Sequence, residues 1–292
     1  MDRTAFLKTL AILPLGGIFM NLSELKNITD GFGNTKQMPV LFVGHGSPMN
    51  AIADNAFTRK LGTWGNSFTE RPKAILVVSA HWLTHGTHVM ISPKPKTIHD
   101  FGGFPQALYQ IEYRAPGTPE FASETKHLIT TTDVIDDDQW GLDHGAWTVL
   151  RHMFPKADVP VFQLSIDFSK PPVYHYNLAQ ELKSLRNKGV LIIGSGNIVH
   201  NLYQVDFDEH AKPFDWAIEF DETVKTKLQT HDYTDLINYS SLGKAASLSI
   251  PTNDHYLPML YSLGLTDKNE SLTFTYEEIQ NASISMRCFQ VG

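Results

Sequence analysis

The sequence contains a single cysteine, Cys288, among its 292 residues. A lone cysteine excludes an internal disulfide and any zinc site built from several cysteines. The chain also has no long run of charge of one sign, and its formal net charge is −7. This negative balance argues against nucleic acid as the main partner, because the phosphate backbone is itself negative. A metal site would therefore depend on carboxylates and on the 13 histidines of the chain.

Long apolar runs are also missing. The most apolar N-terminal stretch, residues 10–20, is too short to span a bilayer comfortably and contains Pro14, so we expect no membrane partner. It follows the basic residues Arg3 and Lys8, an arrangement typical of a secretory signal peptide, although no clear A-x-A cleavage site follows. We interpret residues 1–37 as an N-terminal extension and expect a cytoplasmic protein. Export through this segment is one alternative, and a weakly held terminal helix or tail is another.

From residue 38 onward, short apolar runs alternate with amphipathic stretches. We expect strands over residues 39–43, 74–79, 88–92, 159–166 and 190–194. We expect helices over residues 119–131, 143–153, 175–187, 214–229 and 255–263, and one or two strands within 273–289. This alternation predicts an α/β fold, with one domain over residues 38–292 and a largely parallel central sheet flanked by helices.

Three of the predicted strands deliver a histidine at or soon after their ends. His45 stands between two glycines after the first strand, His81 follows the second, and His200 follows the strand at 190–194. In open α/β sheets the ligand crevice lies at the carboxyl ends of the strands. Three imidazoles at one such edge are what a metal site requires. Taken singly, each could instead be an ordinary histidine at a turn or strand end.

The turn Gly194-Ser195-Gly196-Asn197 lacks the lysine of a P-loop and the third glycine of a dinucleotide fingerprint. We therefore expect no nucleotide site there, and expect the turn to open a helix with His200 in its first turn. A fourth histidine, His255, follows a cluster of residues that favour helix starts, 251–254. The helix dipole would disfavour imidazolium and keep a nitrogen free for metal. The alternative is a solvent-facing histidine.

Two further segments predict substrate chemistry. His144 follows Asp143, a carboxylate that could orient this or another imidazole, so we expect His144 to act in acid/base chemistry rather than to bind metal. A buried histidine bonded at a turn is the alternative. Phe101 and Phe104 flank two glycines, which predicts a mobile lid or pocket wall facing an aromatic ring, or else a loop that fills the core. We expect Phe101, Phe104 and Asp143 to contribute to the substrate site.

Several of these segments are similar to those of one known family. They are GHGSPMNAI (44–52), SAHW (79–82), IHDFGGFPQALY (98–109), WGLDHGAW (140–147), QLSID (163–167), GSGNIVHNL (194–202), PTNDHYLPMLY (251–261) and SMRCFQVG (285–292). In this order they resemble the 4,5-DOPA extradiol dioxygenase family, within the class III extradiol ring-cleavage superfamily. The match runs from about residue 38 to the end. One departure is Arg114, where the family usually has proline, and it touches no proposed ligand.

The resemblance implies a class III extradiol dioxygenase-like fold that holds one divalent metal ion, non-haem Fe(II) or Zn(II). It implies that His45, His81, His200 and His255 correspond to the metal-binding histidines, and that His144 corresponds to the acid/base histidine. It further implies a small aromatic diol such as DOPA as substrate and O₂ as co-substrate.

The proposed ligand set leaves other functions open. Non-haem Fe(II) oxygenases typically use two histidines and one carboxylate with open positions, whereas four histidines would close a tetrahedral zinc site. Either one histidine lies outside the ligand set, or the metal is bound loosely. A metal-dependent hydrolase, in which metal-bound water attacks a carbonyl, is the alternative enzyme. A metal-binding protein of the same fold without catalysis is the alternative that is not an enzyme.

Overall fold

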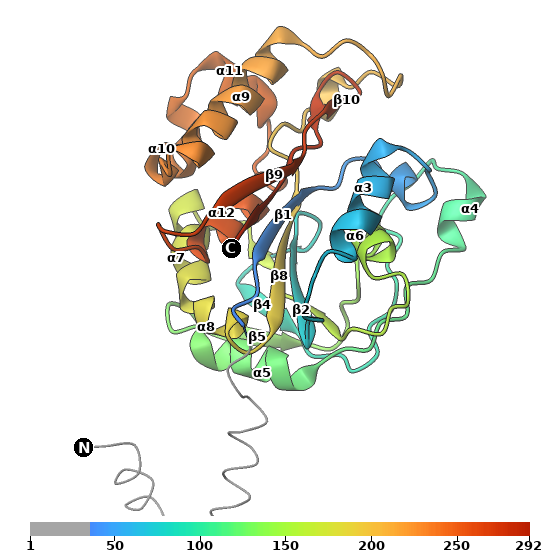
Figure 1. Cartoon of the computed structure of the whole chain (residues 1–292), viewed down its shortest axis with the longest axis vertical. Coiled ribbons are helices and arrows are strands. Elements are labelled where there is room, and N and C mark those ends of the chain that lie inside the picture. Colours follow the sequence, from blue (N-terminus) through green and yellow to red (C-terminus); the bar gives the residue numbers. More distant parts are fainter. Residues whose placement is uncertain (1–35) are drawn as a thin grey trace, which may run out of the picture. The chain divides into compact units, whose positions relative to one another are not determined.

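The central feature of the computed structural model is a sheet of six strands in the order β6-β2-β8-β1-β12-β9 (Figure 1). The structure describes residues 36–292, so the signal-like stretch lies outside the described residues. The strands are β1 (Val40–Gly44), β2 (Ala74–Ser79), β6 (Val161–Gln163), β8 (Val190–Gly196), β9 (Leu272–Tyr276) and β12 (Cys288–Val291). Pairs from β6 to β1 are parallel, and β12 is antiparallel to β1 and β9.

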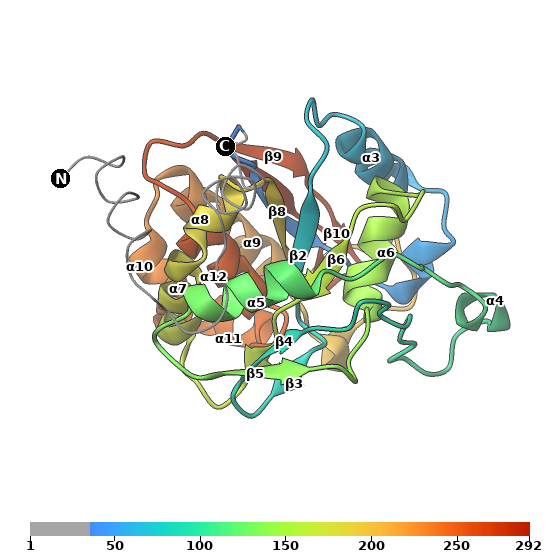
Figure 2. The ribbon, with the colours of Figure 1, turned by 90° about the horizontal axis from the view of Figure 1, so that it is seen from below.

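The central strands β1, β2 and β8 are buried along their whole length. Their uninterrupted apolar runs are typical of parallel strands that helices cover on both faces. Helices α3 (Ala56–Gly65) and α6 (His144–Met153) lie on one face, and α7 (Pro172–Glu181) and α12 (Leu257–Gly264) lie on the other (Figure 2). The predicted α/β fold with a largely parallel central sheet flanked by helices is confirmed.

Further helices and three two-stranded pairs complete the unit Lys36–Gly292. Further helices are α4 (Gln106–Tyr109), α5 (Pro119–Leu128), α8 (Lys183–Arg186), α9 (Asp215–Gln229), α10 (Tyr233–Ile237) and α11 (Lys244–Ser249), with the 3-10 helices η1 (Pro48–Ala51), η2 (Leu202–Gln204) and η3 (Tyr239–Ser241). Two-stranded pairs are β3 (Leu83–Thr84) with β7 (Ile166–Asp167), β4 (Thr87–Met90) with β5 (Val134–Asp137), and β10 (Ile279–Gln280) with β11 (Ile284–Ser285). No helix within residues 36–292 is both long and apolar enough to cross a membrane.

Two predicted strands pair differently from the expectation. The strand predicted at 88–92 is β4, which lies outside the central sheet and pairs with β5. The strand predicted at 159–166 is divided into β6 and β7. It divides because the backbone N–H of Ser165 donates to the carbonyl of His88 at 2.9 Å, which takes the chain off the edge of β2.

Three other expectations need correction in their boundaries or number. The helix predicted at 175–187 is two helices, α7 and α8, which meet at Leu182. Helix α12 begins at Leu257, so His255 precedes the helix instead of lying in its first turn. The C-terminal segment forms four strands instead of one or two. Asn281 and Ala282 both have positive φ, at 53° and 61°, and make the tight turn between β10 and β11.

Candidate metal centre

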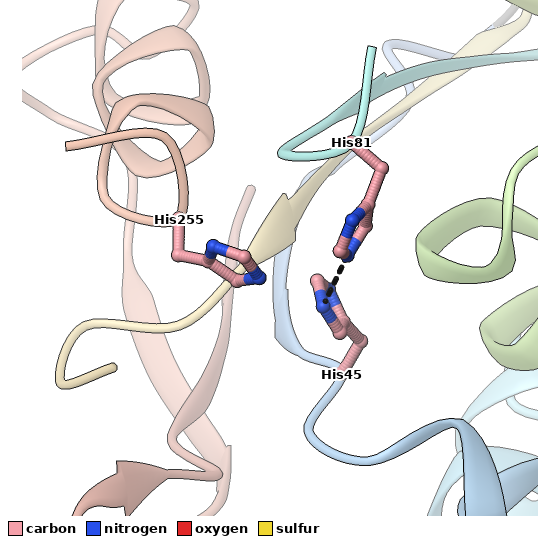
Figure 3. A group of neighbouring side chains, drawn as sticks. All are labelled: His45, His81 and His255. Carbon is pink, nitrogen blue, oxygen red and sulfur yellow. Dashed lines mark hydrogen bonds between the residues drawn. The ribbon is translucent and has the colours of Figure 1, made fainter. Parts of the chain in front are cut away.

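Three of the four predicted metal-binding histidines converge at the carboxyl end of the central sheet. His45 follows β1, His81 comes shortly after β2, and His255 precedes α12. Figure 3 shows their side chains pointing toward one another. One possible ligand atom from each lies within 4.8 Å of the others, and the Nε2 atoms of His45 and His81 are 3.1 Å apart. The sheet order β2-β8-β1 thus brings together residues that are far apart in the sequence.

The end of β8 forms backbone hydrogen bonds to the two segments that carry His45 and His255. The backbone N–H of His45 donates to the carbonyl of Gly196 at 3.1 Å, and that of Asn197 donates to the carbonyl of His255 at 2.8 Å. A Cβ on Gly196 would lie 2.1 Å from the carbonyl oxygen of His255, so this close approach requires glycine. The glycine-rich turn therefore brings two histidines together.

Each of the three converging imidazoles has its Nδ1 atom beside a hydrogen-bond acceptor. The partners are the Ser195 Oγ atom for His45 at 3.0 Å, a carboxylate oxygen of Asp254 for His255, and the Asp100 Oδ2 atom for His81 at 3.4 Å. An acceptor at Nδ1 favours the tautomer that carries its proton there. The lone pair of each ring is then on Nε2.

This arrangement fits a divalent metal ion. In the structure the two Nε2 atoms of His45 and His81, 3.1 Å apart, are in hydrogen-bonding contact (Figure 3), and which one donates depends on the tautomers of the rings. If both rings carry their proton on Nδ1, the two lone pairs face each other and a cation between them relieves the repulsion. Two adjacent nitrogen ligands of one ion, at metal–nitrogen distances of about 2.0–2.1 Å, lie about 2.8–3.4 Å apart. Burial, and after it the charges of neighbouring imidazoles, lower the pKa of His45 and of His255 well below the usual value. The same causes lower the pKa of His81 to about 3, so the rings are neutral near pH 7 and suited to metal.

His144 lies directly beside this group, at the start of α6. Its ring centroid is 3.9 Å from that of His81 and 5.7 Å from that of His45. Asp100 holds it with two bonds: the His144 backbone N–H donates to Oδ1, and the ring Nδ1–H donates to Oδ2, both at 2.9 Å. Burial alone would raise the pKa of Asp100, but these bonds and the nearby imidazoles lower it. The carboxylate is therefore an anion that leaves His144 Nε2 free to accept a proton.

Asp143 lies at the N-cap of α6, and its side chain bonds to Ser79 and Ala146 rather than to an imidazole; its contribution to the substrate site stays a prediction. It is fully buried, and as the N-cap of α6 its side chain accepts the backbone N–H of Ala146 at 3.2 Å and the hydroxyl of Ser79 at 2.6 Å. Burial raises its pKa. Asp143 offers no exposed surface to a substrate, and Asp100, which the sequence analysis missed, is the residue that orients His144.

His200 lies beside the three converging histidines without joining their group. Its ring stacks on that of His255, with centroids 3.5 Å apart and planes 6° apart, and its possible metal-binding group is with Asp254 and His255. The expectation that it starts a helix is wrong. After β8 the chain bends at residues 198–199 and forms no helix; the backbone N–H of His200 then donates to the Ser249 carbonyl, and the residue forms an isolated bridge with Ile284. Its place as a fourth ligand stays a prediction.

The two phenylalanines of the predicted lid differ in their distance from the histidines. The ring centroid of Phe101 is 5.6 Å from that of His144 and 5.4 Å from that of Phe104. Both side chains are partly buried and pack against the core. Phe101 is therefore the residue that reaches the metal centre, and Phe104 supports it. The lid stays a prediction.

Comparison with known proteins agrees with this geometry. Residues 39–286 match the family model described as the catalytic LigB subunit of aromatic ring-opening dioxygenase. A 4,5-DOPA dioxygenase extradiol of Escherichia coli K12 is 45% identical over 269 residues, which cover 91% of this chain and 98% of that protein. One of Beta vulgaris is 39% identical over 234 residues, covering 78% and 87%. The crystal structure of an uncharacterized protein of Escherichia coli K12 has a TM-score of 0.77 and 41% identity, and covers 87% of this chain and 100% of that chain.

The match covers most of the chain, includes every histidine of the centre, and confirms the family predicted from the motifs. The chain belongs to the LigB family of aromatic ring-opening dioxygenases and is an extradiol dioxygenase.

Proposed function

We propose that this extradiol dioxygenase depends on one divalent metal ion and opens the ring of a small catechol, such as DOPA, with O₂. The observation that carries the proposal is the convergence of His45, His81 and His255, each with an acceptor at its Nδ1 atom. Relatives whose names specify 4,5-DOPA support this substrate class.

His45, His81 and His255 would hold the ion through Nε2, which leaves further positions open for the diol and O₂. When bound, Fe(II) supplies electrons to O₂ and draws the diol oxygens toward deprotonation, and Zn(II) supplies only the second effect. Fe(II) is therefore the ion that suits ring opening. The hydrolase and non-catalytic alternatives do not suit membership of a dioxygenase family.

Side chains of the protein would accept the protons that the diol loses on binding. Asp100 accepts the Nδ1–H of His144, so His144 Nε2 can take a proton from a diol bound at the centre, and the Asp100 anion stabilises the imidazolium that results. His200, whose pKa burial lowers to about 4, is a second neutral acceptor, stacked against His255. Phe101 would exclude water beside His144 and offer an aromatic ring to the substrate.

The test is anaerobic loading of the metal-free protein with Fe(II), followed by O₂ uptake with DOPA and simpler catechols. We expect O₂ uptake with a yellow ring-opened semialdehyde as product. Zn(II)-loaded protein is the matched control and should take up no O₂. Ester or amide cleavage that depends on metal, without O₂ uptake, would contradict the proposal, and so would equal turnover by protein without metal.

A further inference from the structure

Ser195 lies at the point where three elements of the metal centre meet. It is on the central strand β8, with Val43 of β1 and Ser79 of β2 as register partners, and is fully buried. Successive residues of a strand face opposite sides of the sheet. A Cβ on Gly194 would meet the Pro258 carbonyl of α12 at 2.3 Å, whereas the hydroxyl of Ser195 contacts α6 on the other side.

The hydroxyl of Ser195 has two partners and one proton. Its Oγ atom is 2.6 Å from the carbonyl oxygen of Gly145 and 3.0 Å from Nδ1 of His45. A carbonyl oxygen can only accept, so the serine proton goes to Gly145. The Nδ1 atom of His45 must then donate to Ser195. A neutral His45 with its proton on Nδ1 has its lone pair on Nε2, the atom that faces His81 at 3.1 Å.

The second partner connects this ligand to the acid/base side of the centre. Gly145 follows His144 in the first turn of α6. A Cβ on Gly145 would lie 2.6 Å from the Ser79 hydroxyl and 2.9 Å from the His81 ring, so this turn packs directly on the end of the sheet. His81 and His255 have carboxylates at Nδ1, and a carboxylate without its proton can only accept. The Ser195 hydroxyl can accept the Nδ1–H of His45 only because it donates its own proton to the Gly145 carbonyl.

We propose that Ser195 is a positioning residue: it fixes His45 in the tautomer with the proton on Nδ1, aims Nε2 at the metal, and ties this ligand to the turn that carries His144. The inference rests on the metal dependence proposed above. Partners that orient a metal-binding histidine typically contribute about 10–100-fold to metal affinity.

The variant Ser195→Ala removes this contact, and Ser262→Ala is its matched control. Ser262 is also a fully buried serine whose hydroxyl donates to a backbone carbonyl, that of Leu41 at 2.9 Å, but it bonds to no imidazole. Both variants should lose thermal stability to a similar extent. Zn(II) affinity, measured by competition with a chelator, should fall by about 10–100-fold in Ser195→Ala and stay at the wild-type value in Ser262→Ala.

The tautomer can be read directly from the metal-free wild-type chain, by heteronuclear NMR of isotopically labelled histidine. We expect His45 to carry its proton on Nδ1, and Ser195→Ala to lose this preference while Ser262→Ala keeps it. Wild-type His45 with its proton on Nε2 would overturn the proposal, even if Ser195→Ala fails to fold. Equal loss of Zn(II) affinity in both variants, or none in Ser195→Ala, would also overturn it. Wild-type protein with the expected tautomer and affinity but no O₂ uptake with any catechol would contradict the proposed function alone.

Discussion

Replacing Asp100 by asparagine tests how the histidines are oriented, because this carboxylate faces two imidazoles. Its Oδ2 atom is 2.9 Å from Nδ1 of His144 and 3.4 Å from Nδ1 of His81, and its Oδ1 atom accepts the backbone N–H of His144. An asparagine that keeps the Oδ1 contact would place its NH₂ group where Oδ2 stands. That group would donate to Nδ1 of His144 and leave the ring proton on Nε2, which could then accept nothing from the substrate.

The opposite orientation of the amide is also unfavourable. It leaves the backbone N–H of His144 without an acceptor, which costs about 1–3 kcal/mol. In both orientations the anion that stabilises a protonated His144 is gone. We therefore expect kcat of Asp100→Asn to fall by about 10²–10⁴-fold, the usual contribution of positioned proton transfer. Metal affinity should fall by up to about 10–100-fold, because His81 also loses its partner.

The assay is O₂ uptake with a catechol at saturating Fe(II), so that kcat is separated from metal affinity. Asp137→Asn is the matched control: its Oδ2 atom is 3.5 Å from Nδ1 of His88, and its Oδ1 atom also accepts backbone N–H groups, but it lies on β5 outside the central sheet. The control should keep the wild-type kcat and metal affinity. Wild-type kcat in Asp100→Asn at full metal occupancy would refute the reasoning.

The remaining predictions concern individual side chains and pH. His45→Ala and His81→Ala should each lose most of the bound metal with the fold intact, and full metal content by elemental analysis would remove that residue from the ligand set. His144→Ala should keep its metal and lose about 10²–10⁴-fold in kcat; loss of metal in parallel with activity would make it a ligand. Phe101→Ala should weaken catechol binding several-fold, since aromatic contacts contribute about 0.5–1.5 kcal/mol beyond area burial, and Phe104→Ala should weaken it less; the reverse order would contradict the placement of Phe101. Because the folded pKa of His81 is about 3, below the unfolded value of about 6.5, the unfolded chain binds more protons over this interval and the metal-free protein should lose stability as pH falls from about 6.5 toward 3. Denaturant melts across this range would test it, and constant stability would contradict it.

The parts of the fold that local sequence determines are predicted well. The apolar runs of β1, β2 and β8 are long enough to be buried on both faces, and their ends agree with prediction to within two residues. His45 and His81 follow two of these strands closely, so the strand boundaries also predict where they lie. The pairing of β4 with β5 could not be predicted in this way, because a partner more than forty residues away leaves no local pattern.

The errors in the site have the same origin. Asp100 is 44 residues from His144, so nothing in the local sequence connects them. Asp143 is adjacent to His144 in the sequence, but it is the N-cap of α6. An N-cap side chain turns back to the first helical N–H groups, so a carboxylate next to a histidine in the sequence need not contact the imidazole ring. His200 was expected in a helix because a glycine-rich turn can open one. Here β8 continues through Gly196, and the chain bends at residues 198–199 and reaches His200 as an isolated bridge without forming a helix.

The central claim, that three histidines hold a catalytic metal through Nε2, is tested most directly by anomalous diffraction from crystals of the chain grown with Fe(II) without oxygen. The account predicts one iron peak per chain, within bonding distance of the Nε2 atoms of His45, His81 and His255, with open positions facing His144. An iron peak held instead by Asp100 and His144, or no iron among these histidines, would contradict it.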